Sequence, residues 1–168
     1  RLTVKELVGF GRFPHNRGHV TQADAEIVGE ALKLFDLTDL AGRFLETLSG
    51  GQRQRALVAM AFCQDTDYLL LDEPLNNLDM YHARQLMLEL RRLADETGRT
   101  IVIVLHDINH ASASADRIIA MKHGRIAADG PHNQIMCPEV LETIYGFAIE
   151  VVETQGMRIA LQYASSVR

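Results

Sequence analysis

The sequence contains no tryptophan, only two cysteines and only four prolines among its 168 residues. Cys63 and Cys137 stand far apart and in no metal-type spacing, which argues against a disulfide scaffold or a zinc module and suits a reduced, cytosolic protein. The longest apolar stretches, Tyr68–Leu71 and Ile101–Leu105, are too short to span a bilayer. No signal peptide is visible, and because the first residue is Arg1 rather than methionine we expect a piece of a longer protein.

Neither sign of charge is in large excess, since 17 Lys and Arg against 22 Asp and Glu give a formal net charge of −5. A mildly acidic chain is a poor non-specific nucleic-acid binder, because neutralising phosphates requires clustered Lys and Arg. Apolar residues make up 47% of the chain and charged residues 23%, which is typical of a globular protein and excludes a disordered one. The length suits one domain.

Helical patterns fill the first third of the chain. Thr3 and Glu6 form a capping-box pattern, and apolar residues recur at helical spacing after Thr21 and again after Ser49. The expected elements are a helix from Thr3 to about Phe10, a loop over 11–18, a helix from Thr21 to about Phe35, a helical stretch or loop over 40–48, and a helix opened by Ser49.

Strands and helices alternate in the remainder, which predicts an α/β sheet with right-handed crossovers. Short, uninterrupted apolar runs are typical of buried parallel strands. The expected elements are strands at 68–71 and 100–105, a helix from Asp79 to about Thr97 ended by Gly98, a helix over 107–115, strands over 117–121 and 125–128, a helix from Pro138 to about Tyr145, and a hairpin of 149–153 with 158–163.

The segment Leu48-Ser49-Gly50-Gly51-Gln52 stands directly before a predicted helix. Ser49 is a preferred N-cap residue, and the two glycines leave the backbone N–H groups of the first turn unobstructed. Because a helix N-terminus presents free N–H groups and the positive end of the helix dipole, this segment suits a phosphate. A simple capped helix explains the same pattern, so both interpretations stay open from these residues alone.

Two acidic residues, Asp72 and Glu73, directly follow the apolar run Tyr68–Leu71. Ligands of α/β proteins bind at the carboxyl ends of the strands. An Asp at that place holds Mg²⁺ in nucleotide hydrolases, and a neighbouring Glu can polarise an attacking water. The alternative is a solvated acidic strand end.

Two further candidate residues are polar and stand after a predicted strand or turn. His106 ends the strand over 100–105, and at the same sheet edge as Asp72 its imidazole could donate to a γ-phosphate. A purely structural histidine is the alternative. Asp79 follows a short polar turn after Pro74, and its simplest role is the N-cap of the next helix.

In their order along the chain, these four segments resemble the ATP-binding-cassette (ABC) ATPases, and the resemblance covers nearly the whole sequence. It implies a P-loop NTPase-like α/β fold with a helical subdomain and an incomplete RecA-like core sheet. It also implies that 48–52 is the signature motif and that Asp72 closes the Walker B strand and helps to hold Mg²⁺. Glu73 then corresponds to the catalytic base, Asp79 to the D-loop aspartate of the dimer, and His106 to the switch histidine that steadies the γ-phosphate.

The same resemblance implies ATP and Mg²⁺ as cofactors and a second ABC ATPase subunit as partner, in a head-to-tail homodimer. The signature residues would bind ATP in trans, so that they contact the γ-phosphate held by the partner's P-loop. These residues are Ser49, Gly50, Gly51 and Gln52.

A narrower resemblance points to the ATPase subunits of bacterial importers for siderophore-bound iron, haem and vitamin B12. It rests on Leu2–Val4, Gly11–His15, Gln52–Ala56 and Leu105–Asn109, while the form of Leu75–Asp79 is most similar to the ferric-siderophore branch. It implies a transmembrane permease as partner, an indirect link to a substrate-binding protein, no nucleic acid, and a peripheral location at the cytoplasmic face of the inner or cell membrane. The helical first third should contact the permease.

The chain departs from the family in one respect, because it contains no G-x-x-x-x-G-K-[ST] loop and no Gly-Lys pair. We therefore expect the P-loop, the adenine-stacking aromatic residue and the glutamine loop to lie upstream of Arg1. Because it lacks this loop, the 168-residue chain by itself should not hydrolyse ATP. It should also expose an apolar strand edge or face.

The predicted organisation is a helical subdomain with the signature motif over 1–64, followed over 65–168 by the C-terminal part of the ATPase core and a terminal hairpin. The predicted function of the full-length protein is ATP hydrolysis for a bacterial importer, with iron-siderophore complexes as cargo. One alternative is a soluble ABC ATPase of DNA repair or translation, although no coiled-coil, zinc or basic insertion is visible. The other is that these residues alone form a non-catalytic binding or assembly module.

Overall fold

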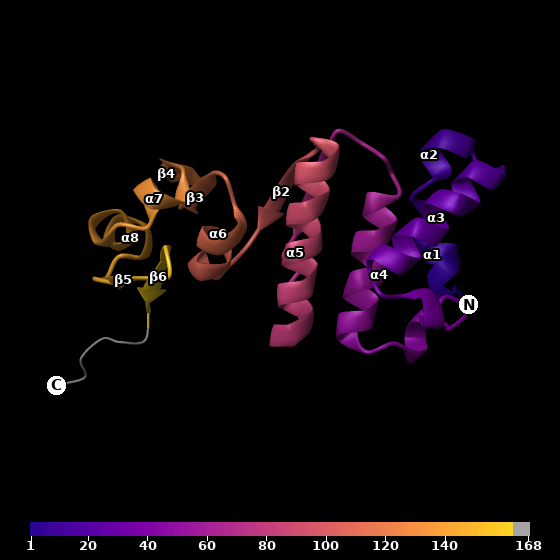
Figure 1. Cartoon of the computed structure of the whole chain (residues 1–168), viewed down its shortest axis with the longest axis horizontal. Helices are drawn as coiled ribbons and strands as arrows, with labels where there is room; N and C mark the ends of the chain where they lie inside the picture. Colours follow the sequence, from indigo (N-terminus) through magenta and orange to yellow (C-terminus); the bar gives the residue numbers. More distant parts are fainter. Residues whose placement is uncertain (163–168) are drawn as a thin grey trace. The chain divides into compact units, whose positions relative to one another are not determined.

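The computed structural model of the chain describes residues 1–162. They form two compact units, Arg1–Val104 and the residues from Leu105 onward (Figure 1). The predicted subdomain boundary near residue 64 lies inside the first unit and stays a prediction. No helix within the described residues has the length and apolar character to cross a membrane.

The elements of the first unit follow the predicted order closely. They are α1 (Val4–Phe10), α2 (Phe13–Asn16), α3 (Gln22–Leu34), the 3₁₀ turns η1 (Thr38–Leu40) and η2 (Leu45–Thr47), α4 (Gly50–Phe62), β1 (Tyr68–Asp72), α5 (Met80–Thr97) and β2 (Thr100–Val104). Each of α1, α3 and α4 begins with a capping box, in which the N-cap hydroxyl accepts the N–H of the third helical residue and that residue's side chain accepts in return. The predicted caps Thr3, Thr21 and Ser49 are confirmed.

The predicted loop over 11–18 is wrong in its centre, where Phe13–Asn16 form the single turn α2. The reason is a buried side chain before it, since Arg12 is only 8% exposed. Its guanidinium donates to Asp24 Oδ1 at 2.9 Å and to the carbonyl of Cys63 at 3.0 Å. His15 Nε2 lies 2.7 Å from the carbonyl of Gln64. These contacts hold the segment against the last turn of α4.

Helices α1, α3 and α4 pack around one apolar core, in which the rings of Phe35 and Phe62 meet edge to face with centroids 5.8 Å apart. Gly11 lies where α1 meets α4, because a Cβ added there would sit 2.1 Å from the carbonyl oxygen of Met60. The neighbouring Cys63 is a free, fully buried cysteine, and burial raises the pKa of its thiol to about 11.

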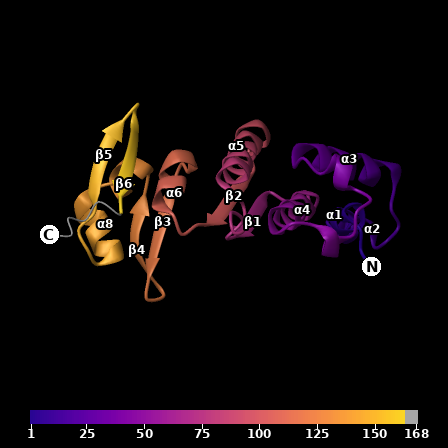
Figure 2. The same cartoon turned by 90° about the horizontal axis from the view of Figure 1, so that it is seen from below.

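The predicted parallel strands are confirmed, because β1 and β2 pair in parallel from Tyr68 opposite Thr100 to Asp72 opposite Val104. Helix α5 connects the two strands (Figure 2). Asp79 caps its N-terminus, and Gly98 follows its last turn in the left-handed conformation. One sheet face belongs to the buried core. The other face is apolar and open, as predicted. Leu70 on it is 71% exposed, and Tyr68, Val102 and Val104 are also exposed.

The second unit contains two hairpins and three helices within its described residues. They are α6 (Ile108–Ser114), β3 (Ile118–Lys122), β4 (Arg125–Gly130), α7 (His132–Ile135), α8 (Pro138–Tyr145), β5 (Glu150–Thr154) and β6 (Met157–Leu161). Strands β3 and β4 pair in antiparallel fashion, at the place of the strands predicted over 117–121 and 125–128. Strands β5 and β6 also pair in antiparallel fashion and form the predicted hairpin. The last residue of the predicted strand 158–163 lies outside the described residues. The side chain of Asn109 ties α6 to β6 through the N–H and C=O of Ala160.

Candidate functional site

The N-terminus of α4 carries the glycine-rich segment with Ser49 as its cap. The Ser49 hydroxyl accepts the N–H of Gln52 at 3.2 Å, and the Gln52 side-chain oxygen accepts the N–H of Ser49 at 3.0 Å. Gly50 and Gly51 lie in the first turn of α4, where the backbone N–H groups have no acceptor within the helix. The Ser49 hydroxyl also keeps its own hydrogen as a donor. This helix end therefore offers several donors to an anion, as its sequence predicts.

The two glycines have a second reason to be glycines, because the turn after β1 packs against them. A Cβ on Gly50 would lie 3.1 Å from Cβ of Asn77, and a Cβ on Gly51 would lie 3.1 Å from Cδ2 of Leu78 and 3.3 Å from the carbonyl oxygen of Asn77. Reasoning from the sequence attributed the glycines only to an unobstructed backbone. The glycine-rich segment and the turn before α5 are thus in direct contact within the first unit.

The two predicted carboxylates follow β1 in different environments. Asp72 ends the strand and is exposed, opposite Val104 of β2. Glu73 has φ of 48°, a left-handed conformation that non-glycine residues adopt rarely and that occurs at functional sites. Its N–H donates to the carbonyl of Val104 at 3.2 Å. The side-chain amide of Asn76 donates to Oε2 of Glu73, so the carboxylate lies over its own turn.

Asp79 caps α5, as predicted. Its carboxylate accepts the N–H of His82 at 2.8 Å and contacts His82 Nδ1 at 2.8 Å and 2.9 Å. The backbone bond from His82, followed by the side-chain bond, lowers the pKa of Asp79. These contacts account for a capping role, while the role in a D-loop stays a prediction.

His106 lies in the second unit, directly before Asp107, which caps α6 by accepting the N–H of Asn109 at 2.8 Å. The structure thus brings the signature segment together with the turn that carries Glu73 in one unit. The convergence of His106 on Glu73 stays a prediction.

A magnesium ion fits the site only when a nucleotide supplies part of its coordination. No group of three or more His, Cys, Asp or Glu side chains among residues 1–162 could hold a metal ion. Asp72 supplies one exposed carboxylate at a strand end, and Mg²⁺ commonly takes one or two carboxylates with phosphate and water oxygens as its other ligands. The donor set present therefore suits an ion that arrives with a nucleotide.

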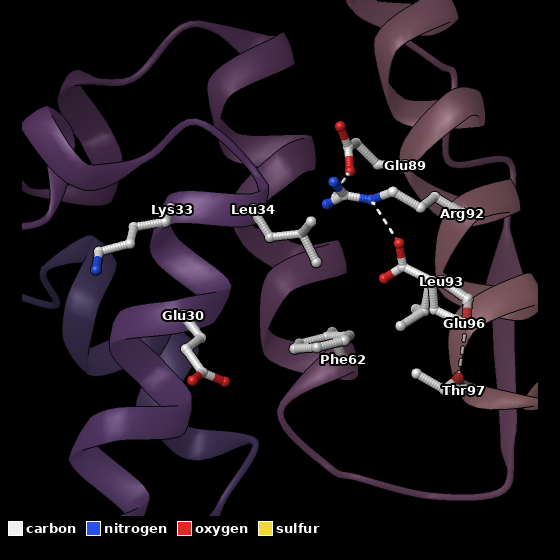
Figure 3. Close-up of a pocket in the computed structure, with 9 residues that line it drawn as sticks. All are labelled: Glu30, Lys33, Leu34, Phe62, Glu89, Arg92, Leu93, Glu96 and Thr97. Atoms are coloured by element: carbon white, nitrogen blue, oxygen red, sulfur yellow. Dashed lines mark hydrogen bonds and ion pairs between the residues drawn. The ribbon is translucent and has the colours of Figure 1, made fainter.

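A cavity of about 490 Å³ lies elsewhere, between α3, α4 and α5 (Figure 3). Phe62, Leu34 and Leu93 provide its apolar surface. Arg92 from α5 pairs with Glu89 at 2.8 Å and with Glu96 at 3.9 Å along its rim. No predicted site residue lines this cavity, so it is not part of the candidate site.

Sequence reasoning placed Asn77 in the short polar turn before Asp79 but missed Asn76 as a member of the site. Asn77 has φ of 63°, a conformation in which asparagine is enriched, so the Asn-Asn pair after Pro74 could have signalled a turn with a left-handed residue. Nothing in the sequence pattern indicates that the Asn76 amide reaches Glu73. That contact depends on the left-handed turn at Glu73 itself.

The glycine-rich helix end, the strand that ends at Asp72 before Glu73 and the turn that follows this strand define the class of protein as an ABC ATPase domain. Residues 1–76 match the family model described as ABC transporter. The chain superimposes on an inward-facing ABC transporter assigned to the metal-chelate type with a TM-score of 0.84 and 26% identity, over 96% of this chain and 67% of that one. On the dimeric bacterial ABC transporter cassette MJ0796 the TM-score is 0.71 with 32% identity, over 78% and 57% of the two chains.

The chain belongs to the ABC transporter ATPase family, and it is close to the ATP-binding proteins of siderophore and haem import. It is 48% identical over 164 residues to the petrobactin import ATP-binding protein YclP of Bacillus subtilis, covering 98% of this chain and 65% of that protein. It is 41% identical over 154 residues to the ferric enterobactin transport ATP-binding protein FepC of Escherichia coli, covering 90% and 57%. The chain thus spans less than two thirds of these relatives. The predicted fold class and family are confirmed.

Proposed function

We propose that the full-length protein containing this chain is the ATP-hydrolysing subunit of a bacterial importer for iron-siderophore complexes. The observation that carries the proposal is the contact between the N-terminus of α4 and the turn that follows β1. In this contact Gly50 and Gly51 pack against Asn77 and Leu78. Asn77 and Leu78 lie in the turn between Glu73 and Asp79. A phosphate-binding helix end and an acidic strand end are two of the parts that nucleotide hydrolysis needs. The likeness to siderophore import proteins supports the cargo.

The chain's own residues would divide the chemistry between two ATP sites of a homodimer. Ser49 and the N–H groups of the first turn of α4 donate to the γ-phosphate held by the partner subunit. Glu73 accepts a proton from the attacking water, and His106 donates to the γ-phosphate. Asp79 contributes to the dimer interface through the turn that it ends. Asp72 would hold Mg²⁺, which when bound neutralises phosphate charge.

The partners and the location follow from the same proposal. A transmembrane permease would bind the helical region over 1–64, and a substrate-binding protein would act through that permease. The protein would then lie at the cytoplasmic face of the membrane as a peripheral subunit. The 168 residues alone, without a G-x-x-x-x-G-K-[ST] loop, would form a module that does not hydrolyse ATP.

The test is Glu73→Gln in the full-length protein, which keeps the size of the side chain and removes its basicity. ATP affinity should stay within about threefold, while the kcat of hydrolysis should fall at least about 100-fold, because general-base catalysis contributes factors of about 10² to 10⁴. Glu142→Gln, an exposed substitution on α8, is the matched control and should leave both values unchanged. Normal turnover in Glu73→Gln would contradict the assigned role.

A further inference from the structure

In the turn between β1 and α5, the Glu73 carboxylate accepts a hydrogen bond from a neighbouring side chain. The Asn76 amide donates to Glu73 Oε2, and the N–H of Asn76 donates to the carbonyl of Glu73 at 3.1 Å. Asn76 is exposed and Glu73 is half-buried, so packing alone does not fix the direction of the glutamate. The amide of Asn76 therefore supplies a directional restraint on this carboxylate.

Four contacts hold the backbone of the turn in place, so the bond from Asn76 acts on a fixed backbone. The N–H of Glu73 donates to Val104 of β2, and Pro74 is fully buried. The N–H of Leu78 donates to the carbonyl of Leu75 at 3.2 Å. Asn77 sits against Gly50 of α4. With its backbone held, the Glu73 side chain can still rotate about its own bonds, and the bond from Asn76 favours one of its rotamers.

We propose that Asn76 is a positioning residue for Glu73, whose amide orients the carboxylate toward the water that attacks ATP. This inference rests on the proposed function, since it assigns Asn76 a part in that same reaction. A bond from a neutral donor to a carboxylate is charge-assisted and directional. An ionised carboxylate has about four acceptor positions on two oxygens, so it can accept from Asn76 and from a water at once.

Two variants of the full-length protein separate the donor from the branched shape of the side chain. Asn76→Leu keeps the branching of the side chain at Cγ and removes the donor, and Asn76→Asp keeps the shape and places a second negative charge beside Glu73. The kcat of ATP hydrolysis should fall at least about tenfold in Asn76→Leu and further in Asn76→Asp, because small misplacements of a reacting group cost up to about 100-fold. The Kd for ATP should stay within about threefold in both variants.

Asn133→Leu and Asn133→Asp, at an exposed position in the second unit, are the matched controls and should hydrolyse ATP normally. Measuring Glu73→Gln in parallel distinguishes a failure of the Asn76 positioning role from a failure of the proposed function. If Glu73→Gln loses turnover while both Asn76 variants keep it, the positioning role is wrong and the proposed function stands. If Glu73→Gln keeps turnover, the proposed function fails and this inference fails with it. A higher kcat in Asn76→Leu, or an equal loss of kcat and ATP affinity, would also overturn the positioning role.

Discussion

Gly11 offers the sharpest test of the packing between α1 and the glycine-rich helix α4. An alanine Cβ at this position would lie 2.1 Å from the carbonyl oxygen of Met60 and 2.7 Å from Cβ of Cys63. The backbone of Gly11 is helical, with φ of −56°, so alanine is conformationally allowed and only the missing space opposes it. Gly11→Ala therefore isolates a steric effect.

The size of that effect follows from the overlap. The Met60 oxygen belongs to the backbone of α4, so relief requires α1 and α4 to separate by about 1 Å rather than a side chain to rotate. Overpacking of this kind costs about 1–3 kcal/mol. Separation would also stretch the hydrogen bond from Arg12 to Cys63 in the adjacent turn, which contributes about 1 kcal/mol. We expect a total destabilisation of about 3 kcal/mol.

Amide hydrogen exchange is the suitable assay, because two compact units need not unfold as one cooperative transition. In Gly11→Ala the amides of α4 should exchange about 100-fold faster, while those of the second unit serve as an internal standard. Gly9→Ala is the matched control on the same helix, since nothing lies within 4 Å of its added Cβ, and it should stabilise α1 by about 0.5–1 kcal/mol. Unchanged or slower exchange in Gly11→Ala would refute the described packing.

Two other predictions concern acid stability and nucleotide binding. The N–H of Thr21, followed by the Arg12 guanidinium, holds the pKa of Asp24 well below its usual range. A folded-state pKa below the unfolded-state pKa stabilises the fold at pH values above the unfolded-state pKa. The free energy of opening of α3, measured by amide hydrogen exchange, should therefore stay unchanged down to about pH 5 and fall below about pH 4. Asp24→Asn should flatten that loss, and an unchanged acid dependence would contradict it. The 168-residue chain alone should bind ATP more weakly than about 1 mM by calorimetry, and micromolar affinity would contradict the expected need for a P-loop.

Much of the fold could be predicted because its signals are local. Thr3, Thr21, Ser49 and Asp79 are cap residues directly before periodic segments, and each one begins a helix in the structure. The runs before Asp72 and His106 are short and apolar, and both form strands. Such elements depend on neighbours within about four residues, so their sequence patterns suffice.

The features that escaped prediction depend on residues far apart in the sequence or on backbone geometry. Helix α2 forms because Arg12 is buried against Asp24 and the end of α4. The contact of Asn77 with Gly50 joins two segments that lie more than twenty residues apart. The bond from Asn76 to Glu73 needs the left-handed conformation of Glu73, which no residue type signals by itself.

Iron uptake by living cells tests the central claim most directly. The measurement is the uptake of radioactive iron, supplied in turn as each of a panel of ferric siderophores, in cells whose only copy of the gene carries Glu73→Gln. We predict that uptake of at least one ferric siderophore falls to the level of a strain lacking the gene, although the variant protein is made in normal amount. Cells whose only copy of the gene carries Glu142→Gln should take up that siderophore as well as unmodified cells do. Uptake equal to that of unmodified cells for every ferric siderophore would contradict the account.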